Sequence, residues 1–153
     1  MQTESRLRVA GGDAVAALKS GDINVLAHQV NLQGVMGAGI AKQIREAFPN
    51  VYELYREAVR THELGLANVQ LVRVGPSQWI ANIAGQSKFG RGGNHTDYGA
   101  LRMAFSDLAE FLDGTSLRVG LPYGFGCGLA GGDWSIVSQI IAEHLPQAVL
   151  YRL

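Results

Sequence analysis

A histidine, the residue type whose ordinary pKa suits acid–base catalysis near neutral pH, lies near the end of an apolar run in the first fifth of the chain. His28 belongs to residues 23–30, INVLAHQV, which suit a strand buried on both faces. An imidazole has a reference pKa near 6.5, so it acts as a general base toward water or as a general acid toward a leaving group. The alternative is a structural histidine whose ring is satisfied inside the core.

Glycine is the compositional anomaly of the chain. There are 20 glycines in 153 residues, about 13% against an average of about 7%. They gather in residues 34–39, 85–93 and 120–132. Clustered glycine marks loops that need positive φ or a close approach of the backbone to a ligand.

Two of these glycine loops each join a buried strand to a helix. The first includes Gly37 and Gly39, and the second includes Gly124, Gly126 and Gly128. A helix N-terminus offers unpaired N–H groups and a positive dipole end, so it receives phosphate without a lysine. Neither G-x-x-x-x-G-K-[ST] nor G-x-G-x-x-G occurs in the first loop, which argues against a P-loop NTPase. Either loop alone is as well explained by a tight turn, but together they predict a two-sided cradle for a diphosphate.

The elements that position these loops alternate between strands and helices, which predicts a three-layer α/β domain with a mainly parallel sheet. Thr96 is expected as the N-cap of a helix over residues 96–112, and Asp133 is expected to cap the final helix. We expect strands at residues 7–10, 23–30, 69–74, 78–83, 117–121 and 148–153, and helices at 15–19, 40–48, 51–62, 96–112 and within 131–145.

Length and charge narrow the classes of function. The 153 residues fit one domain, with no internal repeat or linker. Thirteen basic and thirteen acidic residues give a formal net charge of zero, which argues against strong binding to duplex nucleic acid. A single cysteine, Cys127, excludes a disulfide framework, and no residue cluster has metal-ligand spacing. The sequence has no leader pattern and no apolar run of about 18 residues, so the chain is expected to be cytoplasmic and not bound to membranes. It is also expected to be a monomer.

Three motifs carry a resemblance to a known family. They are H-x-x-N followed by MGAGIAKQI, then GCGLAGGDW, and finally VLYRL. In order and spacing they are similar to the macrodomains, in the branch of the ADP-ribose-1''-phosphate phosphatases and the terminal ADP-ribose glycohydrolases. The resemblance covers residues 7–153, implies an α/β/α fold with a mixed, mostly parallel sheet, and calls for no cofactor or metal.

The resemblance implies a site for ADP-ribose at the carboxyl ends of the strands. Asp13, which follows Gly12, is expected to accept a hydrogen bond from the adenine amine. Asp22, which follows Gly21, also fits the family's Gly-Asp motif and is the alternative. Tyr123 or Phe125 is expected to cover the ribose. The full set of binding residues that the resemblance implies is Asp13, Ala14, Gln33, Met36, Gly37, Ala38, Gly39, Ile40, Gln86, Tyr123, Gly124, Phe125, Gly126, Cys127, Gly128 and Leu129.

The same resemblance implies three catalytic residues. His28 is expected to activate water, Asn31 to position the distal ribose hydroxyls or a terminal phosphate, and Asp133 to orient the water or pair with His28. Asn31 is otherwise a turn residue. Asp133 is otherwise only a helix cap, and Cys127 is read as a small packed residue rather than a nucleophile.

Two departures from the glycohydrolase pattern argue against a mechanism that depends on a nucleophilic lysine. Gln86 stands where those relatives place a nucleophilic lysine, and Ala130 stands where they carry an aspartate. A glutamine amide is no nucleophile of that kind. Lys88, Arg91 and His95 follow on a glycine-rich segment, by default a solvated surface loop.

The sequence therefore predicts an ADP-ribose-binding protein that hydrolyses a group from the distal ribose, with ADP-ribose-1''-phosphate as the expected substrate. Two alternatives stay open. One is a module that binds ADP-ribose without turning it over. The other is a hydrolase that removes ADP-ribose from protein or nucleic acid.

Overall fold

Six strands and five helices form in the part of the chain that the computed structural model describes, residues 7–88, 93–128 and 130–153. The strands are β1 (Arg8–Gly11), β2 (Val25–Val30), β3 (Val69–Gly75), β4 (Gln78–Ala84), β5 (Val119–Pro122) and β6 (Val149–Arg152). The helices are α1 (Ala14–Ser20), α2 (Gly39–Ala47), α3 (Pro49–Arg60), α4 (Tyr98–Leu112) and α5 (Trp134–His144).

The strands form one mixed sheet in the order β1-β6-β5-β2-β4-β3. Neighbouring strands are parallel except for β3 and β4, which form an antiparallel hairpin at one edge. The carboxyl ends of β1, β6, β5, β2 and β4 therefore face the same rim of the sheet, which is where ligands bind in such sheets.

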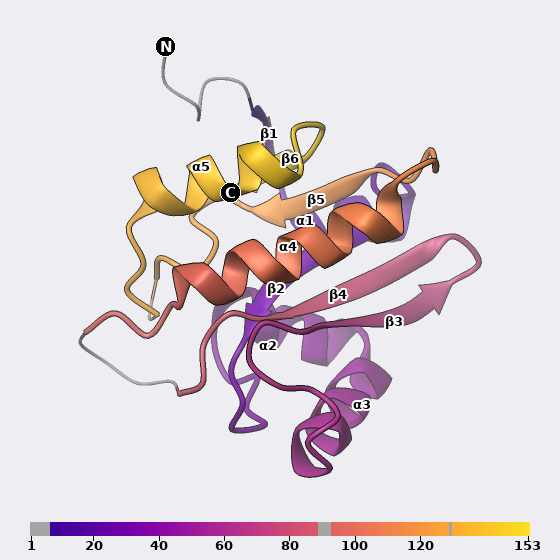
Figure 1. Cartoon of the computed structure of the whole chain (residues 1–153). Coiled ribbons are helices and arrows are strands. Elements are labelled where there is room, and N and C mark those ends of the chain that lie inside the picture. The colour runs from indigo at the N-terminus through magenta and orange to yellow at the C-terminus, as the bar shows by residue number, and fades with distance from the viewer. Residues whose placement is uncertain (1–6, 89–92, 129) are drawn as a thin grey trace.

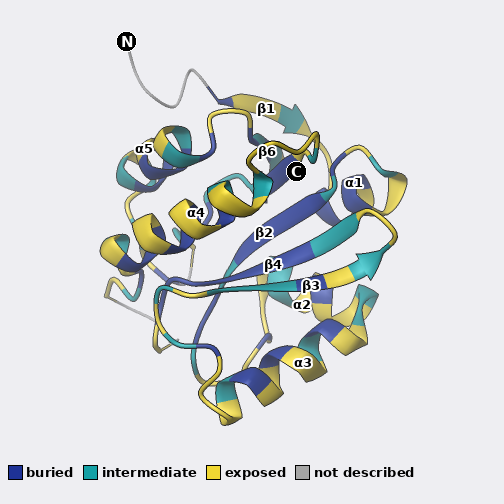
Figure 2. Cartoon of the chain, turned by 45° about the vertical axis from the view of Figure 1, so that its right-hand side comes forward, coloured by how far each residue is buried: buried dark blue, intermediate teal, exposed yellow. Residues whose placement is uncertain are grey.

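Helices cover both faces of the sheet, which confirms the expected three-layer fold. On one face α4 and α5 pack Leu101, Phe105 and Ile140 against the strands. On the other face α1, α2 and α3 do the same, with Tyr55 of α3 fully buried. Figure 1 shows α4 crossing the near side of the sheet and α2 behind it, and Figure 2 shows β2 buried through the centre.

Alternate residues of β2 serve the two layers, because successive side chains of a strand point to opposite faces. Val25 and Ala27 belong to the core beneath α4 and α5. Leu26 and Val30 belong to the core beneath α1, α2 and α3. This alternation also sends His28 and Gln29 to opposite faces.

The helix starts are set by aspartates in three cases. Asp13, Asp97 and Asp133 each accept a hydrogen bond from a backbone N–H in the first turn of α1, α4 and α5. The cap expected at Asp133 is confirmed. The cap expected at Thr96 is wrong, because Asp97 holds that position and Thr96 is buried.

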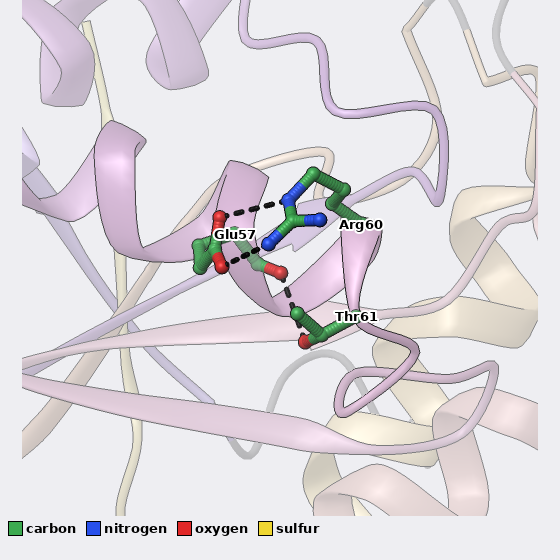
Figure 3. Close-up of polar contacts among 3 residues, drawn as sticks. All are labelled: Glu57, Arg60 and Thr61. Atoms are coloured by element: carbon green, nitrogen blue, oxygen red, sulfur yellow. Dashed lines mark hydrogen bonds and ion pairs between the residues drawn. The ribbon is translucent and has the colours of Figure 1, made fainter.

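The outer end of α3 carries polar contacts that are exposed to solvent (Figure 3). Arg60 pairs with Glu57 at 2.5 Å, and the Thr61 hydroxyl donates to the Glu57 carbonyl at 3.0 Å. Exposed pairs of this kind contribute little to stability and weaken with salt. None of the described helices is both long and apolar enough to span a bilayer.

Candidate ligand-binding cleft

A cleft of about 720 Å³ lies along the carboxyl ends of the parallel strands. Its volume is within the usual range of small-molecule sites. Each of five strands contributes residues at or just beyond its end. The lining residues are Gly12, Asp13, Ala14, Gln29, Ala38, Gly39, Ile40, Ala41, Gln43, Gln86, Pro122, Tyr123, Gly124, Phe125, Gly126, Gly128, Ala130, Tyr151, Arg152 and Leu153.

The N-terminus of α2 forms one wall of the cleft. Its N-cap residue is Ala38, which makes no side-chain capping bond, unlike the aspartates of α1, α4 and α5. Gly39, Ile40 and Ala41 are the first residues of the helix, and all three line the cleft. Their N–H groups have no acceptor within the helix, so together with the helix dipole they favour an anion.

The loop after β5 forms the opposite wall. Phe125 is 2% exposed and packs on Phe105 with ring centroids 5.4 Å apart, so it anchors the loop in the core. Tyr123 is half-buried and lies 4.9 Å from the Trp134 ring, with the Arg152 guanidinium 4.6 Å above it. Of the two aromatic residues expected to cover a ribose, Tyr123 is therefore the more exposed.

The charged side chains of the cleft lie at its β1–β6 end. Among the described lining residues these are Asp13 and Arg152. The Asp13 carboxylate accepts from Val15 N–H at 2.9 Å, which leaves its second oxygen for another donor. Asp22, the alternative to Asp13, is exposed and does not line the cleft.

Neutral amides line the β2–β4 end of the cleft. The Gln29 Nε2 atom donates to Gln86 Oε1 at 2.7 Å and to Thr96 Oγ1 at 2.9 Å. Thr96 Oγ1 donates to the Gly126 carbonyl at 2.7 Å, and Gln86 Nε2 donates to the Lys88 carbonyl at 2.6 Å. The Gln29 Oε1 atom is buried and accepts no hydrogen bond. Gln29, Gln86 and Thr96 are called the amide cluster below.

His28 lies in the core on the other face of β2. Its side chain is fully buried, and its Nε2 atom is 2.6 Å from Asn82 Oδ1. Asn82 in turn donates to Gln70 Oε1, and Gln70 donates to the Leu54 carbonyl of α3. Burial lowers the pKa of His28 to about 4, against the opposing effect of the Asn82 hydrogen bond. His28 is not among the residues that line the cleft.

Asn31 organises the turn that follows β2. Its Oδ1 atom accepts from Gln33 N–H at 2.9 Å, its Nδ2 atom donates to the Val35 carbonyl, and the Tyr55 hydroxyl lies 2.8 Å from Oδ1. The residue is 8% exposed and does not line the cleft.

The Asp133 carboxylate caps the start of α5. Its carboxylate accepts from both the N–H and the hydroxyl of Ser135, and these bonds lower the pKa of Asp133. Nearby, burial is the main cause that raises the pKa of the Cys127 thiol to about 11, so the thiol stays protonated at neutral pH. Neither residue lines the cleft.

The structure brings most of the expected binding residues together. The expected residues that line the cleft are Asp13, Ala14, Ala38, Gly39, Ile40, Gln86, Tyr123, Gly124, Phe125, Gly126 and Gly128. The expected residues that do not line it are Gln33, Met36, Gly37 and Cys127. Met36 is fully buried in the core beneath α1, α2 and α3. Leu129 and Arg91 lie outside the described residues.

Several lining residues were not expected from the sequence. The most informative are Gln29, Tyr151 and Arg152. Gln29 has a signal in the sequence, because a polar residue next to His28 in an apolar strand must face the opposite side of the sheet. Tyr151 and Arg152 belong to β6, which lies between β1 and β5 and so contributes to the same end of the rim as Asp13.

Comparison with solved structures finds this fold repeatedly. A protein of unknown function from Bacteroides thetaiotaomicron matches with a TM-score of 0.87 and 30% identity, over 96% of this chain and 98% of that one. A macrodomain protein from Streptomyces coelicolor matches with a TM-score of 0.72 and 30% identity, over 86% of this chain and 88% of that one. No protein-family model matches the chain.

The curated relatives carry the names of enzymes. A DNA ADP-ribosyl glycohydrolase from Thermus aquaticus is 29% identical over 127 residues, which covers 80% of this chain and 34% of the relative. An ADP-ribose 1''-phosphate phosphatase from Meyerozyma guilliermondii is 38% identical over 58 residues, 38% of this chain and 33% of the relative. The chain thus spans about a third of the length of the curated relatives it matches.

Proposed function

The chain belongs to the macrodomain family, and from that premise we propose that it binds ADP-ribose in the cleft and hydrolyses a group from the distal ribose. One observation carries the proposal. The uncapped start of α2 faces the glycine loop after β5 across a cleft of about 720 Å³. Two sets of backbone N–H groups on opposite walls suit a diphosphate, which is the centre of ADP-ribose.

The strand order gives the ligand its direction. Asp13 follows β1, and Gln86 follows β4, four strand positions away in the sheet. Strands lie about 4.8 Å apart, so these ends are separated by roughly 19 Å, a span suited to an extended dinucleotide. We place adenine at Asp13, whose free carboxylate oxygen can accept from the exocyclic amine, and the distal ribose toward Gln86.

ADP-ribose-1''-phosphate is the proposed substrate, with ADP-ribosylated DNA as the next to be tried. The relatives from Meyerozyma guilliermondii and Thermus aquaticus are named for activity on these two classes of substrate. In either reaction water supplies its oxygen to the atom that loses the leaving group, and its proton goes to that group. Gln86 has no amine with which to attack the sugar.

His28, Asn31 and Asp133 are the catalytic candidates for activating that water. Each makes structural hydrogen bonds away from the cleft. A direct role for Asn31 or Asp133 requires the turn after β2 or the start of α5 to move when substrate binds, and a direct role for His28 requires β2 itself to rearrange, because the ring is buried on the other face of that strand. The same observation favours a second candidate function, binding of ADP-ribose without turnover.

The first experiment combines calorimetry with ADP-ribose and an assay of phosphate release from ADP-ribose-1''-phosphate. Micromolar binding, about −8 kcal/mol, together with phosphate release by the wild type that collapses in His28→Ala while that variant still binds ADP-ribose, supports the phosphatase. Binding without release from either ADP-ribose-1''-phosphate or ADP-ribosylated DNA supports the binding module. The absence of any binding contradicts both functions.

A further inference from the structure

In the amide cluster, at the β2–β4 end of the cleft, only one assignment of donors and acceptors satisfies the hydrogen bonds. We propose that Gln86 donates a hydrogen bond to an acceptor oxygen of the ligand, and that Gln29 and Thr96 are positioning residues that hold the Gln86 amide for this purpose. The inference rests on the proposed binding of ADP-ribose, and it assigns the sugar end of that ligand to a neutral donor.

Two backbone carbonyls determine the direction of the cluster. The Gly126 carbonyl only accepts, so the single hydrogen of the Thr96 hydroxyl points to it, and Thr96 Oγ1 must accept from Gln29. The Gln29 atom facing Thr96 is therefore nitrogen, and the Gln86 atom bonded to that nitrogen is oxygen.

The opposite end of the cluster agrees with this assignment. With its oxygen turned toward Gln29, Gln86 places its nitrogen at the Lys88 carbonyl, which also only accepts. An amide nitrogen carries two hydrogens, and within the described part of the chain only the Lys88 carbonyl receives one. Because Gln86 lines the cleft, its second N–H is left for a ligand acceptor.

Close packing of the backbone holds Gln29 in place. A Cβ atom on Gly85 would lie 2.4 Å from Gln29 Oε1, and one on Gly126 would lie 3.0 Å from the same atom. Gln29 Oε1 is also buried without a donor. Turning the Gln29 amide would break its hydrogen bonds to both Gln86 and Thr96. The assignment of donors and acceptors is therefore kept, although it leaves Gln29 Oε1 without a donor.

The chemistry of the ligand follows from this direction. A donor at this end favours a ribose hydroxyl, a ring oxygen or a bridging oxygen, all of which accept. The charged residues of the cleft, Asp13 and Arg152, lie at the other end of the strand order. The amide cluster therefore recognises the sugar by one neutral hydrogen bond of set geometry.

A double-mutant cycle on the full chain tests the assignment, with the Kd for ADP-ribose as the readout. We expect Gln86→Ala to raise Kd about 10-fold and Thr96→Val about 5-fold, as expected for the loss of one hydrogen bond. Thr96→Ser keeps the hydroxyl and should restore Kd to within about 2-fold of wild type. In the Gln86→Ala background, Thr96→Val should add nothing. Gln147→Ala, at an exposed position outside the cleft, is the control.

Three results would each overturn part of the proposal. Unchanged binding by Gln86→Ala removes the donor and leaves the proposed function standing. Equal effects of Thr96→Val in the two backgrounds show that Thr96 acts through the Gly126 loop instead. A wild-type chain that binds no ADP-ribose overturns the proposed function together with the donor role.

The positioning role has a readout that needs no ligand. In the free protein, Thr96→Val should shift the side-chain NH₂ resonances of both Gln29 and Gln86, because the hydrogen bonds run through Gln29. Wild-type shifts for Gln86 in that variant would show that no relay exists. Thr96→Ser should return both resonances close to their wild-type positions.

Discussion

At the scale of residues, two neighbours in β2 have opposite surroundings. His28 faces the core beneath α1, α2 and α3, and Gln29 faces the cleft. The apolar run of residues 23–30 predicts the strand but not which side chain faces which layer, since both faces are buried. Chemistry was therefore expected at the histidine, and the structure places the cleft amide at the residue beside it.

The buried His28 makes stability depend on pH. Its pKa is about 4 in the folded chain, against about 6.5 when unfolded, so the unfolded state binds more protons between these values and stability falls as pH drops through that window. Wild type should lose about 3 kcal/mol from this group between pH 7 and pH 4. Urea unfolding of His28→Gln should show a loss smaller by that amount.

The control for that measurement is His62→Asn, at an exposed histidine whose positive φ of 62° asparagine tolerates. This variant should follow the wild-type pH dependence. An identical dependence in His28→Gln would show that His28 is not the group responsible.

Asp13 has two tasks that one substitution separates. Asparagine keeps an oxygen for Val15 N–H and so preserves the cap of α1, but it replaces the second oxygen with a donor. We expect Asp13→Asn to lower ADP-ribose affinity about 10- to 100-fold, as for loss of one hydrogen bond to a charged group. Asp97→Asn, the matching change at the cap of α4, should leave the calorimetric Kd unchanged.

At the scale of elements, the chain is well described by its sequence. Apolar runs and turn residues predict every strand to within about two residues, as at 78–83 against Gln78–Ala84. The cap of α4 was misassigned because Thr96 and Asp97 are both good capping residues. Only the packed structure shows Thr96 turned inward to the Gly126 carbonyl.

Alanine substitutions at two glycines with nearly the same φ distinguish the cost of backbone strain from an effect on ligand binding. Gly126 has a φ of 72° and Gly114 a φ of 73°, but a Cβ would meet Gln29 only at Gly126. Alanine at either position should cost about 1–2 kcal/mol of unfolding free energy from the left-handed backbone. Gly126→Ala alone should weaken ADP-ribose binding, by 10-fold or more in calorimetry. An equal loss of affinity in Gly114→Ala would contradict a local effect at the cleft.

At the scale of the whole molecule, ligand binding should appear as thermal stability. Free ADP-ribose at 100 times its Kd adds about 2.7 kcal/mol, or roughly 5–10 °C in Tm for a chain of this size. AMP at the same concentration should give a smaller shift, because it reaches only the Asp13 end. Arg60→Ala, which removes the exposed pair of Figure 3, should shift as wild type does. An equal or larger shift with AMP would contradict the proposed contacts of the distal ribose at the β2–β4 end of the cleft.

The pairing of β1 with β6 has a consequence for the order of folding. Arg8 lies opposite Val149 in the register, so the charged end of the cleft is built by the contact with the greatest separation along the chain. Loop closure over such a distance is slow, so this pair should form late and exchange its amide hydrogens early. A ligand that reaches from Asp13 to Gln86 would then tie the end of β1 to the end of β4, across β6, β5 and β2, and so slow the opening of the β1–β6 pair.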